Sequence, residues 1–235
     1  MPDFSKRSYE KELLDRTDIP FADIKRNMQE LEFINSKLGG HQITINGFRD
    51  LCKRIDKKDI EVCEIGCGGG DNLKAVAKWC QKNKIVVNLV GIDINKDCIE
   101  YANENCSNLS NNKFIASDYR AINFSSHKPD IIFSSLFTHH LNDHEFIEML
   151  QWNKRNSSVG FFINDLHRHF LAFHSIRLLT RLFSNSYLVR NDAPLSVRRG
   201  FTKIELEKLL RQAGIKQYQI KWKWAFRWLI IVRHE

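Results

Sequence analysis

The stretch "VCEIGCGGGDNL", residues 62–73, contains four glycines within the five positions from Gly66 to Gly70. An apolar run that carries a single acid, Glu64, leads into it. Glycine costs chain entropy wherever it is not needed, so this density indicates a demand on the backbone. The loop follows a strand-like run and precedes a helical pattern, so its amides are expected to meet a ligand at a helix N-terminus.

The spacing of the glycines excludes two common ligand loops. A dinucleotide fingerprint, G-x-G-x-x-G/A, would need a small residue at position 71, which is Asp71. A phosphate loop would need Gly-Lys-Ser/Thr after four intervening residues, and the sequence has no such run. The remaining pattern is E-x-G-x-G-x-G, formed by Glu64, Gly66, Gly68 and Gly70.

Apolar runs of strand length alternate with helical patterns on both sides of this loop. Such alternation favours a parallel sheet covered by helices on both faces, a doubly wound α/β fold. The predicted strands lie near residues 60–66, 86–93, 112–117, 129–135 and 158–164, and the helices near 71–83, 96–106 and 143–155.

The regular alternation stops after the fifth strand. Residues 167–200 are predicted to be an insertion made of one helix, "HFLAFHSIRLLTRLFS", and an irregular stretch, "NSYLVRNDAPLSVRRG". Thr202 and Glu205 then form a capping-box pattern that opens a helix ending at Gly214. Two more strand-like runs complete a seven-stranded sheet, near residues 217–224 and 226–233.

The N-terminal part is predicted to be helical. Apolar residues between Pro20 and Leu38 recur at the spacing of a helix stripe, and Gly39 and Gly40 supply the stop. A shorter helix is expected over residues 45–55. We therefore predict a helical cap over residues 1–56, with disorder unexpected beyond about the first dozen residues.

Composition indicates one globular, cytoplasmic protein of 235 residues. The N-terminus is dense in charge where a signal peptide needs an apolar core, and no run reaches the length of a membrane span. The six cysteines have no paired C-x-x-C spacing, so we expect free thiols and no metal. The net charge is +8. Residues 166–200 contain six arginines but a single acid, Asp192.

The motifs from about Ile60 to the C-terminus resemble those of the class I S-adenosylmethionine (SAM) dependent methyltransferases. The resemblance implies a catalytic domain over residues 57–235, with SAM as cofactor. It also implies roles for the strand ends: Glu64 would hold the amino end of SAM, Asp93 the ribose hydroxyls and Asp118 the adenine amino group. Neighbouring residues expected at the cofactor are Gly66, Gly68, Gly70, Ile94, Tyr119 and Ser134.

The fourth strand, "PDIIFSSLFTHHL", resembles the corresponding motif of the small-molecule branch, which includes ubiquinone and menaquinone biosynthesis methyltransferases. Relatives that methylate planar amino groups carry Asn/Asp-Pro-Pro-Tyr/Phe, whereas this chain has Ser134-Ser135-Leu136-Phe137. This argues against a DNA substrate. RNA stays open on charge alone.

Histidines follow the fourth and fifth strands, whose ends should converge beside the transferable methyl group. A phenol, with a pKa of about 10, attacks well only as it loses its proton, so a histidine held by a carboxylate is a suitable base. We predict His140 as the base and Asp165 as the group that orients it or binds the substrate hydroxyl. His139 and His167 are the alternatives.

By the same resemblance, residues 167–200 would form a lid over an acceptor pocket that Phe137 also lines. A weaker similarity links this stretch to methyltransferases of polyketide and aromatic-pigment pathways in secondary metabolism. Arg168, Arg198 and Arg199 could pair an anionic or carrier-bound acceptor, or could simply be solvated.

The predicted function is methyl transfer to a small aromatic or polyketide-like acceptor, at oxygen in preference to carbon. The alternatives are an RNA or protein methyltransferase, a catalytically silent SAM-binding module and a nicotinamide oxidoreductase, which Asp71 disfavours. The acceptor itself and the oligomeric state do not follow from the sequence.

Overall fold

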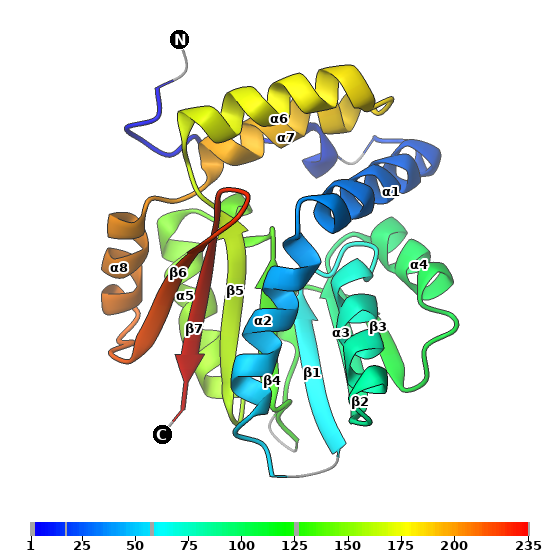
Figure 1. The fold of residues 1–235 in the computed structure, drawn as a ribbon, viewed down its shortest axis with the longest axis vertical. Coiled ribbons are helices and arrows are strands. Elements are labelled where there is room, and N and C mark those ends of the chain that lie inside the picture. Colours follow the sequence, from blue (N-terminus) through cyan, green and yellow to red (C-terminus); the bar gives the residue numbers. More distant parts are fainter. Residues whose placement is uncertain (1–2, 17, 57–58, 125–126, 235) are drawn as a thin grey trace.

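The computed structural model describes residues 3–16, 18–56, 59–124 and 127–234 (Figure 1). One seven-stranded sheet has the order β3-β2-β1-β4-β5-β7-β6. Strands β1 to β5 are parallel, and β7 runs antiparallel between β5 and β6. The strands are β1 (Asp59–Ile65), β2 (Val86–Asp93), β3 (Asn112–Ala116), β4 (Ile131–Ser135), β5 (Gly160–Leu166), β6 (Tyr218–Lys223) and β7 (Arg227–Arg233).

Eight α-helices accompany the sheet in the described residues, so the predicted doubly wound α/β fold is confirmed. Short 3-10 turns at Leu13–Asp15, Tyr119–Ala121 and Thr138–His140 complete the structure. The helices are α1 (Phe21–Lys37), α2 (Gly40–Cys52), α3 (Asp71–Lys82), α4 (Lys96–Asn105), α5 (Asp143–Asn156), α6 (Phe170–Phe183), α7 (Tyr187–Arg199) and α8 (Lys203–Gln212).

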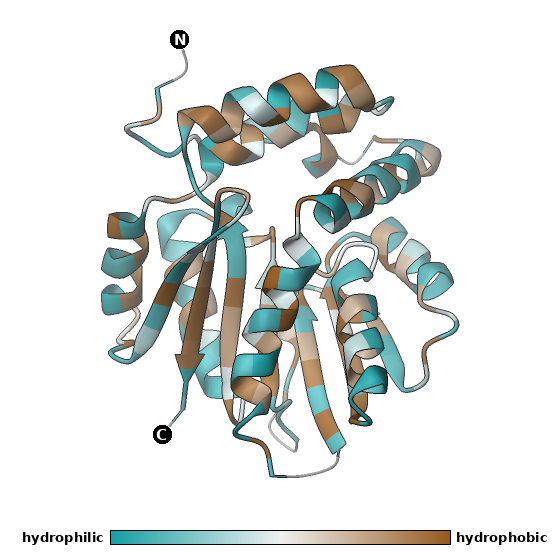
Figure 2. Cartoon of the chain, viewed as in Figure 1, coloured by the Kyte–Doolittle hydropathy of each residue, from teal (hydrophilic) through white to brown (hydrophobic). Residues whose placement is uncertain are grey.

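Two hydrophobic cores lie on opposite faces of the sheet. Phe48 of α2 and Val76 of α3 belong to one core, whereas Phe146 of α5 and Leu210 of α8 belong to the other. The central strands are apolar along most of their length in Figure 2, as expected when both faces are covered. Helices α6, α7 and α1 lie above the carboxyl ends of the parallel strands (Figure 1).

Strand register brings the ends of β1 and β2 together. Ile65 pairs with Ile92, and the amides of Gly66 and Cys67 donate to the Ile92 carbonyl. Gly66, which follows β1, and Asp93, the last residue of β2, therefore lie side by side at the edge where ligands bind in open α/β sheets.

The prediction of an irregular stretch after α6 is wrong, because residues 187–199 form the helix α7. Ser186 caps this helix by accepting from the amide of Val189, although Pro194 lies inside it. The helix buries Leu188 and Val189, and packing of this apolar side outweighs the local preference of proline. The predicted lid insertion is therefore a pair of helices.

The N-terminal helices are present, with one changed boundary. Helix α1 ends at Lys37, just before the predicted glycine stop, but α2 begins at Gly40 instead of residue 45. Gly39 has a φ of 78°, the left-handed conformation that lets one helix follow another so closely. The predicted domain boundary at residue 57 lies outside the described residues.

The absence of a membrane span and the state of the cysteines were also predicted from the sequence. None of its helices combines the length and the apolar character that crossing a membrane requires. All six cysteines are free, which confirms the prediction of thiols without disulfides.

Candidate active site

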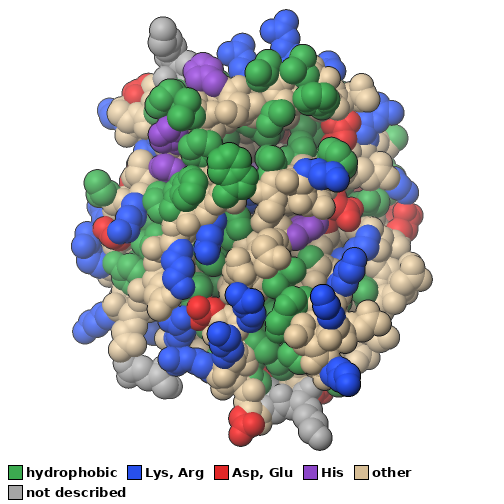
Figure 3. Space-filling view, in the orientation of Figure 1, with side chains coloured by type: hydrophobic (Ala, Val, Ile, Leu, Met, Phe, Trp, Pro, Cys, Tyr) green, Lys and Arg blue, Asp and Glu red, His purple; other side chains and the backbone are tan. Residues whose placement is uncertain are grey.

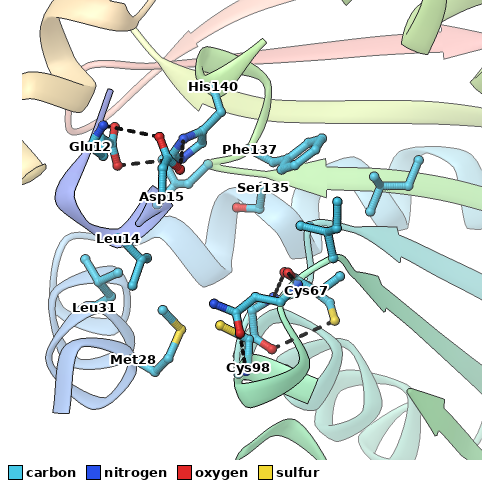
Figure 4. Close-up of a pocket in the computed structure, with 18 of the residues that line it drawn as sticks. Glu12, Leu14, Asp15, Met28, Leu31, Cys67, Cys98, Ser135, Phe137 and His140 are labelled. Atoms are coloured by element: carbon cyan, nitrogen blue, oxygen red, sulfur yellow. Dashed lines mark hydrogen bonds and ion pairs between the residues drawn. The ribbon is translucent and has the colours of Figure 1, made fainter. Parts of the chain in front are cut away.

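A cavity of about 970 Å³ opens at the carboxyl edge of the sheet. Its floor comes from the loops after β1, β2 and β4, and its sides come from α1, α6, α7 and the segment before α1. Ligand sites usually measure about 300–1,000 Å³, so this cavity can hold a cofactor and an acceptor together. Leu14, Met28 and Leu31 face it from the N-terminal side (Figure 4).

The glycine loop is shaped by close approach to aromatic side chains. Gly66 has a φ of 69°, and a Cβ there would lie 2.3 Å from the ring of Phe137. A Cβ on Gly69 would lie 2.7 Å from Tyr101. Larger residues at these two positions would therefore force the loop away from the strands, and Gly66, Gly68 and Gly69 line the cavity with bare backbone.

Asp93 holds the loop and faces the cavity. Its two carboxylate oxygens accept from the amides of Gly68 and Asn95, each at 2.9 Å. Burial raises the pKa of Asp93. The carboxylate still has lone pairs free for hydroxyl donors, as the predicted ribose contact requires.

Glu64 lies beneath the loop, away from the cavity lining. Its carboxylate is fully buried beside Asn72 and Leu73 at the start of α3, and neither oxygen has a hydrogen-bond partner within the usual geometric limits. Burial and the nearby charge of Asp71 raise the pKa of Glu64 well above its ordinary value. Ser134 is likewise buried behind the lining, and Gly70 serves as the N-cap of α3.

The predicted adenine end of the site lies at the opposite rim. Asp118, Tyr119 and the exposed Ile94 line the cavity there. Arg120 binds the Asp118 carboxylate, with 2.5 Å between Nη2 and Oδ2, and this contact lowers the pKa of Asp118. The ring of Tyr119 packs edge-on against Trp152.

His139 and Asp165 form a buried pair. The distance from His139 Nδ1 to Asp165 Oδ1 is 2.7 Å, and Thr138 Oγ1 donates to the other carboxylate oxygen at 2.6 Å. Burial alone would raise the pKa of Asp165, but the charge of His139 and the hydrogen bonds from His139 and Thr138 hold it well below the usual range. Asp165 therefore positions His139 and not the neighbouring His140.

His140 reaches the cavity and faces two acids from the N-terminal segment (Figure 4). Its Nδ1 lies 3.5 Å from Asp15 Oδ1, and its Nε2 lies 3.7 Å from Glu12 Oε2. Burial acts to lower the pKa of His140, but the hydrogen bond that its ring donates to Asp15 and the charge of Glu12 outweigh it, so the net shift is upward. With 24% of its side chain exposed, His140 is the more accessible of the two adjacent histidines.

Sequence reasoning missed Glu12 and Asp15, which lie in the N-terminal segment. Both carboxylate oxygens of Asp192 in α7 accept backbone amides, from Leu13 at 2.8 Å and from Leu14 at 3.0 Å. Ser196 of α7 donates to Glu12 at 2.6 Å. The only local signal was the pair of acids three residues apart, which form a capping box around the 3-10 turn.

Glu12, His139 and His140 also have the donor types of a metal site. Their candidate ligand atoms lie within 4.8 Å of one another. Each member already has a protein partner: Ser196 for Glu12, Asp165 for His139 and Asp15 for His140. We therefore interpret the trio as an acid–base cluster.

Arg227, at the start of β7, is a third residue that the sequence did not single out. Its side chain lines the cavity although the residue is only 5% exposed. Nη2 donates to Asn35 at 3.1 Å, whereas Nη1 has no hydrogen-bond partner. Burial lowers the pKa of Arg227 to about 10, and a buried guanidinium group whose Nη1 has no partner favours an anionic ligand.

The three arginines predicted at the acceptor lie outside the cavity lining. Arg168 pairs with Glu205 at 2.7 Å, and Arg198 pairs with Glu10 at 3.0 Å. Arg199 donates to the carbonyl oxygens of His139 and His140, at 3.1 and 2.8 Å. This placement favours a structural role, because these contacts join the N-terminal segment, the histidine turn and α8.

His167 also lies outside the cavity lining. It accepts a hydrogen bond from Trp222 Nε1 at 3.3 Å. Burial, with the charges of His169 and Arg168, lowers the pKa of His167 to about 4. The neutral ring therefore serves as a packing and hydrogen-bonding residue near the β6–β7 hairpin.

Comparison with protein families agrees with this geometry. Residues 62–156, from β1 to the end of α5, match the family model described as a methyltransferase domain. This part of the chain is similar to methyltransferase domains. No protein of curated function matches the sequence at a significant level.

Solved methyltransferase structures share the fold over most of the chain. The plantazolicin methyltransferase BpumL, in complex with S-adenosylhomocysteine (SAH), has a TM-score of 0.62 at 17% identity and covers 91% of this chain and 96% of its own. A SAM-dependent methyltransferase from Aquifex aeolicus gives 0.63 at 17%, covering 92% and 99%. The magnesium protoporphyrin IX methyltransferase from Synechocystis gives 0.59 at 14%, covering 86% and 88%.

Proposed function

We propose that this methyltransferase transfers the methyl group of SAM to an oxygen of a small aromatic or polyketide-like acceptor, with His140 as the base. The observation that carries the proposal is the shared cavity. It is lined by the glycine loop and Asp93 on one side and by His140 and apolar residues of α1, α6 and α7 on the other.

The residues around the cavity fit SAM. Asp93 has free lone pairs for the ribose hydroxyls, Asp118 and Tyr119 lie at the proposed adenine end, and the bare loop from Gly66 admits the methionine half. The unpaired Nη1 of Arg227 suits the methionine carboxylate. Bound SAM would supply a methyl group on a positively charged sulfur.

The chain's own residues supply the acid–base chemistry. His140 accepts the proton of the acceptor hydroxyl, and Glu12 and Asp15 stabilise the imidazolium that results. Phe137, Leu141 and the lid residues Ile176 and Val197 surround the acceptor with apolar surface. That surface excludes water and favours an apolar, aromatic acceptor.

The small-molecule acceptor also agrees with two of the structural neighbours, which are named for plantazolicin and for magnesium protoporphyrin IX. A cavity closed over by α6 and α7 would admit such molecules more readily than a folded RNA or protein segment. Oxygen is favoured because His140 is suited to deprotonating a hydroxyl group of pKa about 10 as it attacks.

The test is an acceptor screen with methyl-labelled SAM. Phenols, hydroxynaphthalenes and polyketide-like aromatics are compared with transfer RNA and with protein lysate. We expect label in the organic extract, in an O-methyl product identified by mass spectrometry, and loss of that product with His140→Asn. Label only in RNA or protein would contradict the proposed acceptor class.

The carboxylate role of Arg227 predicts a selective loss of affinity. Charge-assisted hydrogen bonds are worth about 1.5–3 kcal/mol, so Arg227→Gln should weaken SAH binding about tenfold to a hundredfold in calorimetry. Methylthioadenosine, which lacks the amino-acid part, should bind the variant as it binds the parent. Arg233→Gln is the control, since Arg233 pairs with Asp50 outside the cavity. An equal loss for both ligands would give Arg227 a structural role only.

A further inference from the structure

The outer surface of the lid is unusually apolar. On α6 the exposed hydrophobic side chains are Phe170, Leu171, Leu178, Leu179, Leu182 and Phe183. The most exposed of them is Phe183, with 76% of the residue accessible to solvent. Single exposed apolar residues are common, but a contiguous group on one helix marks an interaction surface. Figure 3 shows hydrophobic side chains gathered over this end of the molecule, with basic side chains at its margin.

The spacing on α6 separates an inner and an outer apolar face. Phe173 and Thr180 are buried, and Ile176 between them lines the cavity. Leu171, Leu178 and Leu182 follow one another at intervals of seven and four residues and therefore share the opposite side of the helix. Packing of the lid explains the inner face, and no described residue of the chain covers the outer face.

The tip of the β6–β7 hairpin extends this surface. The ring of His169 stacks on Phe170 and on Phe226, with centroid distances of 4.8 and 5.2 Å, and Phe226 meets Trp222 edge-on at 6.1 Å. Trp224, next to this group in the chain, is 67% exposed. We call α6 and this tip the lid surface. Tryptophan is common at membrane–water interfaces, and Trp224 lies at the margin of the lid surface.

The charged groups of the lid surface have one sign. Arg177 and Arg181 lie one turn apart on α6, and Arg190 is exposed beside the lid surface on α7. Glu10, which lines the same groove as Arg177 and Arg190, is paired with Arg198. Among the residues that the structure describes, no acidic side chain forms an ion pair with Arg177, Arg181 or Arg190. An anionic partner would complement them. A second copy of the chain, packed through α6, would bring the like charges of the arginines together.

We propose that the lid surface docks on an anionic membrane surface, with the leucine and phenylalanine side chains in the interface and the arginines on lipid phosphates. An apolar helix face edged by basic residues is the pattern of interfacial helices that lie in the membrane plane. Docking in this way places the cavity directly behind α6, beside the bilayer. The proposal does not depend on the identity of the methyl acceptor.

Vesicle flotation with the full chain tests this docking. The vesicles contain phosphatidylcholine alone or an equal mixture with phosphatidylglycerol, and no methyl acceptor is present. We expect binding to the mixed vesicles. Arg177→Glu with Arg181→Glu should reduce it at least about tenfold, and Leu178→Ser with Leu182→Ser should reduce it by a similar factor or more.

Matched controls lie at the other end of the molecule. Lys78→Glu with Lys82→Glu repeats the charge change one turn apart on α3, and Val86→Ser changes an exposed apolar residue at the start of β2. Both controls should bind vesicles as the parent does, and thermal melting checks the fold of every variant.

Absence of binding to the mixed vesicles would overturn the proposal, as would equal binding by the α6 variants and the controls. Light scattering supplies a further test: a dimer that Leu178→Ser with Leu182→Ser converts to a monomer would identify the lid surface as a self-association interface instead.

Discussion

Asp93→Ala is expected to weaken SAH binding about a hundredfold or more in calorimetry. The proposed ligand donates two ribose hydroxyls to this carboxylate, and each hydrogen bond to a charged group is worth about 1.5–3 kcal/mol. The same carboxylate holds the amide of Gly68 at 2.9 Å, so its removal also loosens the glycine loop. Both effects reduce affinity.

The pH dependence of SAH binding gives this prediction a second readout. Burial raises the pKa of Asp93, and only the ionised carboxylate accepts from both hydroxyls. Affinity in the parent should therefore fall as the pH drops through that raised pKa, and Asp93→Ala should lack this dependence.

Asp59→Ala is the control for Asp93→Ala. Asp59 begins β1 at the opposite edge of the sheet and accepts from the Asn88 side chain at 2.8 Å. This variant should bind SAH as the parent does. Normal SAH affinity in a folded Asp93→Ala variant would show that the glycine loop has another ligand, and the proposed SAM site would then be wrong.

The sequence was sufficient for the sheet and for the floor of the cavity, because both depend on local patterns. Alternating apolar runs identify the parallel strands, and the strand ends place Gly66, Asp93 and Asp118 at one edge whatever the details of packing. The Thr202–Glu205 capping box was equally local and is confirmed at the start of α8. Such features need only near neighbours in the chain.

The missing parts of the site depend on contacts between distant residues. Glu12 reaches His140 because α7 holds the N-terminal segment, through contacts such as the one from Asp192 to the amide of Leu13, 179 residues away. Arg227 reaches the cavity only because β7 inserts beside β5. The spacing of apolar residues along the chain does not indicate such long-range contacts. Helix α7 was predicted to be irregular for the same reason, because it is stabilised by its packing against the rest of the fold.

His139 and His140, neighbours in one 3-10 turn, show the same limit of sequence-based prediction. The sequence pairs His139 and His140 with the acid after the fifth strand, but it cannot say which ring meets which carboxylate. In the structure Asp165 belongs to His139, and His140 takes its acids from the N-terminal segment. The role proposed for His140 therefore rests on a different partner from the predicted one.

His140→Asn is expected to reduce kcat by about two to four orders of magnitude, the usual contribution of general acid–base catalysis. SAH affinity should change little, because no hydrogen bond joins His140 to Asp93 or to the other described residues proposed to hold the cofactor. His144→Gln is the control, since His144 is 81% exposed on α5. Unchanged kcat in His140→Asn would remove His140 from the mechanism.

The rate–pH profile separates a base from a merely structural histidine. The base acts in its neutral form, so kcat should rise with pH through the pKa of His140 and level off above it. Asp15 and Glu12 raise this pKa, whereas burial and Arg199 oppose the shift, so the midpoint should lie above the ordinary value of about 6.5.

Asp15→Asn removes one of the two charges that raise the pKa of His140, so the whole profile should move to lower pH. At a pH below the parent's midpoint the variant should then be faster than the parent, because more of its His140 is neutral. A structural role for Asp15 predicts slower turnover at every pH and an unmoved midpoint. The direction of the shift therefore decides whether the N-terminal segment tunes the base or only closes the cavity.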